Sequence, residues 1–253
     1  MTETITLDSP WIRRFHPAPD RPVRLVCFPH AGGSATYYYG LSRALSAHAD
    51  VLTVQYPGRQ DRRSEPCIDN IPEVADRVFE VLRPLTDRPL VLFGHSMGAV
   101  TAYEVALRLE EAGGPGVPAH LFASGRRAPV RDRAETVHLR DDAGIVEELQ
   151  LLSGTDETLL DDPEFLAMIM PALRNDYRAA ETYRHDPDRL LRCPVTALTG
   201  DDDPKATVDE ARAWGEHTTG EFRLRVFPGG HFYIGDSTDE VAREVAAPLT
   251  RLG

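Results

Sequence analysis

The sequence predicts an α/β fold in which helices cover both faces of a mostly parallel central sheet. Two observations predict it. Short apolar runs rich in β-branched and aromatic residues alternate with amphipathic stretches of helical length, and this alternation is typical of parallel sheets. The chain of 253 residues, 42% of them hydrophobic and 27% charged, is also long and apolar enough to bury a large core. We therefore expect a single domain over residues 1–253.

Six apolar runs have the length and composition of buried strands. They lie at residues 23–28, 51–56, 90–93, 120–123, 195–199 and 222–227. Between them, apolar residues recur three or four positions apart, which indicates amphipathic helices. These helices are expected at residues 37–45, 71–82, 97–109, 208–214 and 241–252.

The interval from residue 131 to residue 192 breaks the alternation, because it contains no convincing strand. Such an interval is too long for a loop without secondary structure in a compact domain. Its apolar positions recur at helical spacing, at Ile145, Leu149, Leu152, Phe165, Ile169, Leu173 and Tyr177. We interpret residues 131–190 as a small helical insertion. The alternative is that they form ordinary core helices.

Charge and composition exclude several classes of function. A net charge of −12 and a pI near 5.2 argue against nucleic acid as a partner, since phosphate binding requires a clustered cationic surface. The chain has neither a signal-like start nor a run of about 18 apolar residues, so we expect a cytoplasmic protein with no membrane partner. Cys27, Cys67 and Cys193 are too few and too scattered for a disulfide framework or a zinc site. They are interpreted as free thiols.

A candidate nucleophile lies in the motif Gly94-His95-Ser96-Met97-Gly98, which matches G-x-S-x-G. The motif follows the expected strand 90–93 and precedes a helix, as a strained strand-to-helix turn requires. Side chains in place of either glycine would collide with neighbouring backbone. The turn is therefore expected to expose the hydroxyl of Ser96.

A serine hydroxyl needs a base and an orienting carboxylate, and both follow in the chain. His231 comes after the strand 222–227, and Asp201, Asp202 and Asp203 come after the strand 195–199. The order Ser, Asp, His is that of the α/β-hydrolase fold. We assign Asp203 as the acid, because a loop that turns after Gly200 can present it. Asp201 and Asp202 can instead face solvent or cap the next helix.

Acyl transfer also requires donors for the developing oxyanion, and in this fold two backbone N–H groups supply them. We assign these to Met97, which follows the nucleophile, and to Ala31, which lies in a glycine-rich turn after the first strong strand. The alternative for Gly32 and Gly33 is a phosphate-binding turn. No further phosphate-binding pattern follows them.

The motifs together resemble those of type II thioesterases, the stand-alone editing hydrolases of polyketide and nonribosomal peptide assembly lines. The matching segments are residues 28–34 (FPHAGGS), 55–59 (QYPGR), 94–98 (GHSMG), 124–129 (SGRRAP) and 230–232 (GHF). Residues 171–177 (PALRNDY) also resemble the helical lid of that family. The resemblance implies an α/β-hydrolase fold with a lid insertion, at about residues 131–190 here.

The resemblance also implies the reaction. Such enzymes hydrolyse stalled acyl or aminoacyl groups from the phosphopantetheine arm of an acyl or peptidyl carrier protein. The proposed triad needs no cofactor or metal, because it supplies nucleophile, base and electrostatic stabilisation itself. We expect a monomer.

Two features near the expected site have alternative interpretations. Arginines at positions 59, 62, 63, 126 and 127 either contact the acidic carrier protein or its pantetheine phosphate, or are solvated or paired internally with Asp61 and neighbouring acids. Met168 and Met170 either adapt the lid to varied acyl groups or are simply core.

Other functions remain compatible with the triad. A small-molecule esterase, a lipase or a chain-releasing thioesterase would use the same residues, although the length of the chain favours a stand-alone enzyme over the last of these. A catalytically silent binding protein could use the same cleft, since a fold does not dictate a function.

Overall fold

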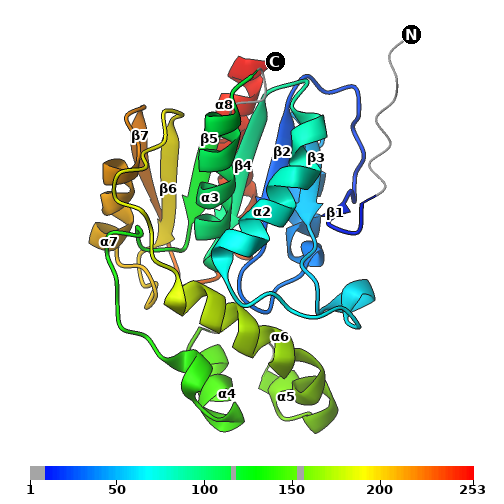
Figure 1. Ribbon diagram of the computed structural model, residues 1–253, viewed down its shortest axis with the longest axis vertical. Helices are drawn as coiled ribbons and strands as arrows, with labels where there is room; N and C mark the ends of the chain where they lie inside the picture. Colours follow the sequence, from blue (N-terminus) through cyan, green and yellow to red (C-terminus); the bar gives the residue numbers. More distant parts are fainter. Residues whose placement is uncertain (1–8, 115–117, 153–156) are drawn as a thin grey trace.

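A seven-stranded sheet forms the centre of the computed structural model, which describes residues 9–114, 118–152 and 157–253 (Figure 1). The strand order is β1-β3-β2-β4-β5-β6-β7, and every neighbouring pair is parallel except β1 and β3. The strands are β1 (Ile12–Arg13), β2 (Arg24–Phe28), β3 (Asp50–Val54), β4 (Leu90–His95), β5 (Pro118–Ser124), β6 (Val195–Gly200) and β7 (Phe222–Phe227). The predicted fold class is confirmed.

The six predicted strands are present, with ends that differ from the predicted ones by at most two residues. The seventh strand, β1, escaped prediction because its two residues, Ile12 and Arg13, form no apolar run. It pairs antiparallel with β3 through Ile12 and Val54. It lies at the edge of the sheet, away from the site described below.

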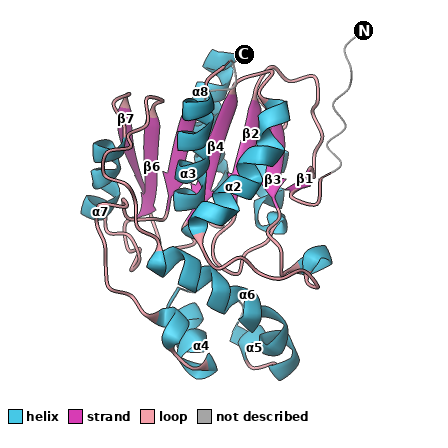
Figure 2. Cartoon of the chain, in the orientation of Figure 1, coloured by secondary structure: helices cyan, strands magenta, loops and turns pink. Residues whose placement is uncertain are grey.

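Helices cover both faces of the sheet, as the amphipathic patterns predicted (Figure 2). The helices α2 (Ile71–Leu82) and α3 (Met97–Ala112) pack on one face, and α1 (Tyr39–Leu45) and α8 (Thr238–Leu252) pack on the other. Successive residues of β2 alternate between these two apolar clusters, since Val26 faces α2 and α3 while Leu25 and Cys27 face α1 and α8.

Capping explains where two of the helices begin. The side chain of Asn70 accepts a hydrogen bond from the N–H of Glu73 at 2.9 Å and starts α2. Thr207 and Glu210 form a reciprocal capping box at the start of α7 (Val208–Arg212). The remaining short turns are 3-10 helices at Ala35–Tyr38, Gln60–Arg62, Arg83–Leu85, Val137–Leu139 and Ala213–His217.

The interval predicted to be helical contains α4 (Asp142–Leu152), α5 (Glu157–Leu160) and α6 (Pro163–Thr182). Residues 153–156 lie outside the described part of the chain. These helices share an apolar cluster separate from the two that flank the sheet, made of Val137, Ile145, Leu149, Leu160, Met170, Leu173 and Tyr177. In Figure 1 they lie below the sheet, with α6 nearest to it. We call residues 131–190 the insertion.

The carboxyl ends of the central strands finish close to one another. Phe28 pairs with Gly94, His95 with Ser124, and Gly200 with Phe227. The loops that follow these strands therefore meet at one end of the sheet, where open α/β sheets bind ligands. No helix in the described residues is long and apolar enough to cross a membrane.

Candidate active site

The turn at Ser96 has a strained backbone. Ser96 has φ 55° and ψ −118°, a left-handed conformation that non-glycine residues rarely adopt. A Cβ on Gly94 would lie 2.1 Å from the carbonyl oxygen of Gly98, and a Cβ on Gly98 would lie 2.0 Å from that of Phe28. Glycine is therefore required on both sides of Ser96, as the motif predicted.

The expected acid and base face each other. Nδ1 of His231 lies 2.9 Å from Oδ1 and 3.0 Å from Oδ2 of Asp203, and both side chains are buried. An ionised carboxylate only accepts hydrogen bonds, so Nδ1 carries the proton and Nε2 is left with a free lone pair. This is the tautomer that a general base requires.

The other two aspartates of the run have different surroundings. Asp201 and Asp202 are exposed, and Oδ1 of Asp201 accepts the N–H of Gly229 at 2.8 Å. Neither caps the next helix, because Thr207 has that role. Of the three aspartates, Asp203 alone has a hydrogen bond to His231.

The loop after β2, residues 29–33, is fixed by hydrogen bonds to its backbone; we call it the oxyanion loop. The hydroxyl of Tyr38 donates to the carbonyl of Phe28 at 2.8 Å, and that of Tyr56 donates to the carbonyl of Pro29 at 3.3 Å. Both tyrosines are fully buried. The start of the loop is therefore held in one conformation.

Two backbone N–H groups in this region are left free. Within the described residues, the N–H groups of Ala31 and Met97 donate to no protein acceptor. Met97 is the first residue of α3, so its N–H has no partner inside the helix and lies at the positive end of the helix dipole. Free, oriented N–H groups of this kind are what a developing oxyanion requires.

One pocket brings the expected site residues together. It has a volume of about 30 Å³, which is room for a few water molecules. Its lining includes four of the five expected site residues, namely Ser96, His231, Ala31 and Met97. Asp203 is behind His231. The rest of the lining is His30, Arg126, Glu135, Tyr177, Ala180, Glu181 and Lys205.

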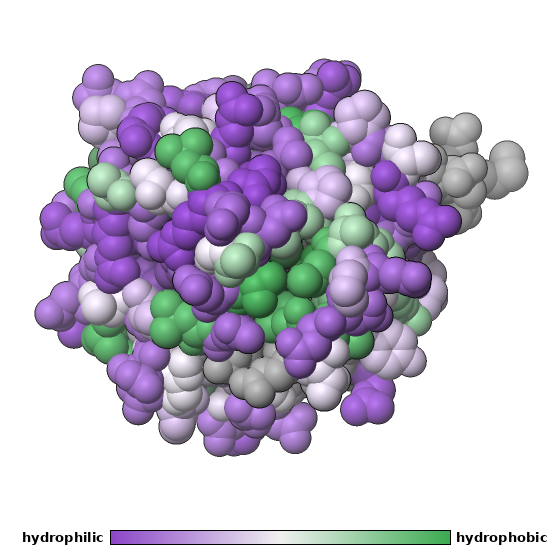
Figure 3. All heavy atoms as spheres, turned by 90° about the horizontal axis from the view of Figure 1, so that it is seen from below, coloured by the Kyte–Doolittle hydropathy of each residue, from purple (hydrophilic) through white to green (hydrophobic). Residues whose placement is uncertain are grey.

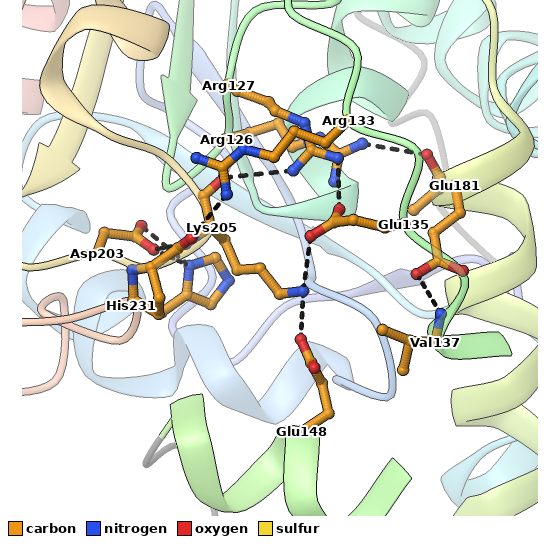
Figure 4. Close-up of polar contacts among 12 residues, drawn as sticks. Arg126, Arg127, Arg133, Glu135, Val137, Glu148, Glu181, Asp203, Lys205 and His231 are labelled. Atoms are coloured by element: carbon orange, nitrogen blue, oxygen red, sulfur yellow. Dashed lines mark hydrogen bonds and ion pairs between the residues drawn. The ribbon is translucent and has the colours of Figure 1, made fainter. Parts of the chain in front are cut away.

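Charged side chains form one wall of this pocket (Figure 4). Nζ of Lys205 lies 2.9 Å from Glu135 and also pairs with Glu148 of α4, while Arg127 pairs with Glu135. Burial opposes ionisation of Glu135, but the charges of Lys205 and Arg127 lower its pKa to about 2. The wall is thus a network of ion pairs that joins the loop after β6 to the insertion.

Arg126 differs from its neighbours in this wall. Among the described residues it forms no ion pair, and it donates one hydrogen bond, to the carbonyl of Ala180 at 3.1 Å. Burial, together with the charge of Arg127, lowers its pKa to about 10. Arg126 therefore remains a cation at neutral pH.

Two other histidines lie near His231 but are held neutral. Burial, followed by the charge of His231, lowers the pKa of His30 to about 3 and that of His95 well below its ordinary value. Nδ1 of His95 lies 2.9 Å from the hydroxyl of Ser124. Neither histidine carries charge at neutral pH, and within the described residues neither has a carboxylate partner of the kind that His231 has in Asp203.

A second cavity, of about 330 Å³, also borders the oxyanion loop. It is lined by Gly32, Ser34, Gly58, Arg59, Gln60, Arg63, Met168, Ile169 and Ala172. The oxyanion loop and α6 therefore both contribute to its walls. Met168 is exposed here, whereas Met170 is buried in the cluster of the insertion, so the core interpretation holds for Met170.

The five arginines considered above do not form a free cationic surface. Three of them are buried in ion pairs: Arg59 with Asp176, Arg62 with Glu65, and Arg127 with Glu135. These three arginines are therefore paired internally. Asp61, which was expected among their partners, pairs with Arg13 instead. Arg63 is exposed and has no ion pair within the described part of the chain.

Sequence reasoning did not find several residues of the site. Asp176, Lys205, Glu135 and Glu148 come from segments far apart in the sequence, and no motif predicted their contacts with the loops around Ser96. Asp176 belongs to residues 171–177, a segment that resembles the thioesterase lid, but nothing in that segment predicts its contacts with Arg59 and Gly32. Among the described residues, no group of three or more His, Cys, Asp or Glu side chains could hold a metal ion.

The parallel sheet, the glycine-flanked turn at Ser96 and the insertion across the carboxyl ends of the strands define the class of the protein, an α/β-hydrolase. Residues 23–249 match the thioesterase domain. The chain belongs to the thioesterase family.

Within this family, the chain is similar to thioesterases from biosynthetic clusters. The chain is 55% identical to a probable cadicidin biosynthesis thioesterase of Streptomyces griseus, over 94% of this chain and 66% of that protein. It is 50% identical to the thioesterase PikA5 of Streptomyces venezuelae, over 94% of this chain and 85% of that protein. The solved structure of BorB, a type II thioesterase from the borrelidin biosynthetic cluster, is 51% identical and covers 94% of this chain and 97% of its own, with a TM-score of 0.88. The resemblance to type II thioesterases is confirmed.

Proposed function

We propose that the protein is a serine thioesterase that removes stalled or aberrant acyl or aminoacyl groups from the phosphopantetheine arm of acyl or peptidyl carrier proteins. Its triad would be Ser96, Asp203 and His231. The observation that carries the proposal is the buried contact between Asp203 and His231, with Ser96 in the same pocket as His231. Membership of the thioesterase family supports the reaction class.

In the first half-reaction, Oγ of Ser96 attacks the thioester carbonyl while Nε2 of His231 takes the hydroxyl proton. The carbonyl oxygen becomes an oxyanion and accepts hydrogen bonds from the N–H groups of Ala31 and Met97. Collapse of the intermediate breaks the C–S bond. His231 returns its proton to the departing sulfur, which restores the carrier thiol and leaves Ser96 acylated.

In the second half-reaction, water attacks the acyl-enzyme with His231 again acting as base. The same two N–H groups stabilise the second oxyanion, and His231 gives its proton to Oγ of Ser96 as the carboxylic acid leaves. Asp203 keeps the imidazole oriented and stabilises its protonated form throughout. No group beyond the side chains, backbone and water takes part in these steps.

The insertion is proposed as a lid of a single α/β-hydrolase domain. Tyr177 and Ala180 of α6 line the pocket beside Ser96, so α6 forms its roof. A pocket of about 30 Å³ is far smaller than an acyl thioester, so substrate entry would require the walls to separate. The cavity of about 330 Å³ on the other part of the oxyanion loop, at Gly32, is proposed as the approach for the pantetheine arm.

The face that carries the insertion suits a protein partner. Figure 3 views this face and shows apolar side chains gathered at its centre, with hydrophilic ones around them. Exposed apolar side chains of the insertion include Leu139, Leu151, Leu159 and Met168. Arg63, exposed beside Met168 at the second cavity, would attract an acidic carrier protein.

The test is intact mass spectrometry of an acetyl-loaded carrier protein incubated with the enzyme, with Ser96→Ala as the control and p-nitrophenyl acetate as a simple ester. We expect loss of the acetyl mass only with the active enzyme, at a higher kcat/KM than for the ester. Rapid ester cleavage with an untouched carrier would support a small-molecule esterase instead. Unchanged function after Ser96→Ala would indicate a binding protein.

A further inference from the structure

A carboxylate of α6 reaches the oxyanion loop, although it is 144 positions away in the sequence. Oδ2 of Asp176 accepts the backbone N–H of Gly32 at 2.7 Å. Gly32 is the residue next to Ala31, whose N–H is free. Asp176 therefore binds the peptide that directly follows the candidate oxyanion donor.

Arg59 completes this contact from a third segment of the chain. Its guanidinium donates to Oδ2 of Asp176 at 2.6 Å and to Oδ1 at 2.9 Å, and also to the carbonyl of Gly33 at 3.2 Å. The two side chains are only 7% and 4% exposed, for Arg59 and Asp176 respectively. Burial opposes the charge of Arg59, yet Asp176 raises the pKa of its guanidinium above the ordinary value. A bidentate pair of this kind has a fixed geometry.

Packing reinforces the polar contacts. A Cβ on Gly32, which has φ +72°, would lie 2.4 Å from Cδ2 of Leu173, one turn before Asp176 on α6. The loop and the helix are therefore in close contact through Leu173 and Asp176. Arg59 joins both of them to the loop after β3.

The hydrogen bonds of the oxyanion loop account for its conformation. Tyr38 and Tyr56 fix the start of the loop, the N–H of Gly33 donates to the carbonyl of His30 at 3.0 Å, and Asp176 takes the N–H of Gly32. The N–H of Ala31 is left unused between these fixed points. Without Asp176, the peptide of Gly32 would lose its acceptor and could rotate, because glycine tolerates many backbone conformations.

We infer that Asp176 is a positioning residue of the reaction, which holds the oxyanion loop so that the N–H of Ala31 points into the active site. The inference rests on the proposed function, since it assumes that Ala31 serves the oxyanion. Asp176 touches no reacting atom and acts through Gly32. Because Asp176 belongs to α6, the oxyanion site is complete only when α6 is docked on the loop.

The test uses hydrolysis of p-nitrophenyl acetate and inhibition by a trifluoromethyl ketone, which forms a tetrahedral adduct with an active serine. We expect Asp176→Asn to lower kcat about 10- to 100-fold, since loss of a whole oxyanion donor costs about 100- to 1000-fold. KM should stay within about threefold, because the ground-state carbonyl does not depend on this donor. The inhibition constant of the ketone should rise by the same factor as kcat/KM falls.

A second variant guards against simple unfolding. Removing one partner leaves a buried charge, which is strongly destabilising, whereas replacing a whole buried pair with apolar residues is often tolerated. Arg59→Met combined with Asp176→Leu removes both charges and the acceptor for Gly32. It should fold, retain the loss of kcat and bind the ketone weakly.

Arg178→Gln is the matched control. Arg178 lies two residues further along α6 and pairs with Asp69 at 3.1 Å, away from the oxyanion loop. It should retain the wild-type kcat and ketone affinity. Wild-type values in the double variant, or an equal loss in Arg178→Gln, would overturn the inference even though Ser96→Ala is inactive. Hydrolysis by Ser96→Ala would instead overturn the proposed function, and the inference with it.

Discussion

Lys205 is hydrogen-bonded through its backbone N–H to the carboxylate of Asp203, the acid of the proposed triad. The backbone N–H of Lys205 donates to Oδ1 of Asp203 at 2.8 Å, and the same oxygen lies 2.9 Å from Nδ1 of His231. The loop after β6 thus turns back on its own carboxylate and fixes its orientation.

Replacing Asp203 by Asn should therefore disable the base. An amide has one acceptor and can present a donor to Nδ1, which favours the wrong tautomer of His231. We expect kcat for p-nitrophenyl acetate to fall about 1000- to 10,000-fold. Asp202→Asn is the matched control, since Asp202 is exposed and its side chain has no contact with His231. A loss of activity in Asp202→Asn as large as that in Asp203→Asn would contradict the assignment.

The nucleophile turn should tolerate no side chain at Gly98. The Cβ of Gly98→Ala would lie 2.0 Å from the carbonyl oxygen of Phe28, which belongs to a central strand and cannot move aside. We expect the free energy of unfolding to fall by at least about 3 kcal/mol, measured by urea denaturation. The control is Gly40→Ala in α1, where the nearest atom is 3.9 Å from the added Cβ. It should be stabilising, by about 0.4–1 kcal/mol.

The features that the sequence predicted well have local causes. Alternating apolar runs and amphipathic stretches determine a parallel sheet with two covered faces, and glycines at 94 and 98 are required by contacts within one turn and one neighbouring strand. The contact between Asp203 and His231 also follows from loops at the ends of two neighbouring strands, β6 and β7. These signals lie within a few residues of the feature that each one predicts.

The contacts that the sequence did not predict depend on the tertiary fold. Asp176 meets Gly32 across 144 positions, and Lys205 meets Glu135 across 70. Nothing in a helical pattern distinguishes a buried, paired aspartate on α6 from a solvated one. The burial of Arg59 could not be predicted for the same reason, because its partner is on the insertion.

Buried histidines should make stability depend on pH. His120 is buried near the start of β5, with Nε2 2.9 Å from the hydroxyl of Thr196. Burial, followed by the charges of Arg251 and Arg223, lowers its pKa from 6.5 to about 4. Between these pH values the unfolded chain binds more protons than the folded one, so the free energy of unfolding decreases as the pH falls below 6.5.

His120→Gln isolates this contribution. We expect the loss of stability between pH 6 and pH 5 to shrink by on the order of 1 kcal/mol, measured by urea denaturation at each pH. Activity at pH 7.5 should stay unchanged, because His120 is at the opposite end of the sheet from Ser96. The exposed His48 provides the control, and His48→Gln should leave the pH dependence as it is. An unaltered slope in His120→Gln would exclude His120 as a source of this dependence.

Of the five arginines, Arg63 is the one whose replacement can test the proposed docking of a carrier protein. The guanidinium of Arg63 is exposed at the second cavity, whereas Arg59, Arg62 and Arg127 are buried and paired, so reversing their charge would disturb the fold. We expect Arg63→Glu to lower kcat/KM for an acetyl-loaded carrier about fivefold to tenfold, because it repels an acidic partner. Hydrolysis of p-nitrophenyl acetate should remain within about twofold of wild type.

Two controls, ionic strength and a charge reversal elsewhere on the surface, separate a local effect of Arg63 from an effect of the net charge of the protein. The difference between Arg63→Glu and wild type should shrink as ionic strength rises, because exposed charges are screened beyond a Debye length of about 10 Å at 0.1 M salt. Arg83→Glu reverses another exposed charge, which follows α2 close to the start of β2 and lies 3.8 Å from Glu80, and it should leave turnover of the carrier unchanged. Equal losses in both variants would mean that net charge alone governs the encounter. A loss confined to Arg63→Glu would place the docked carrier over the cavity between the oxyanion loop and α6.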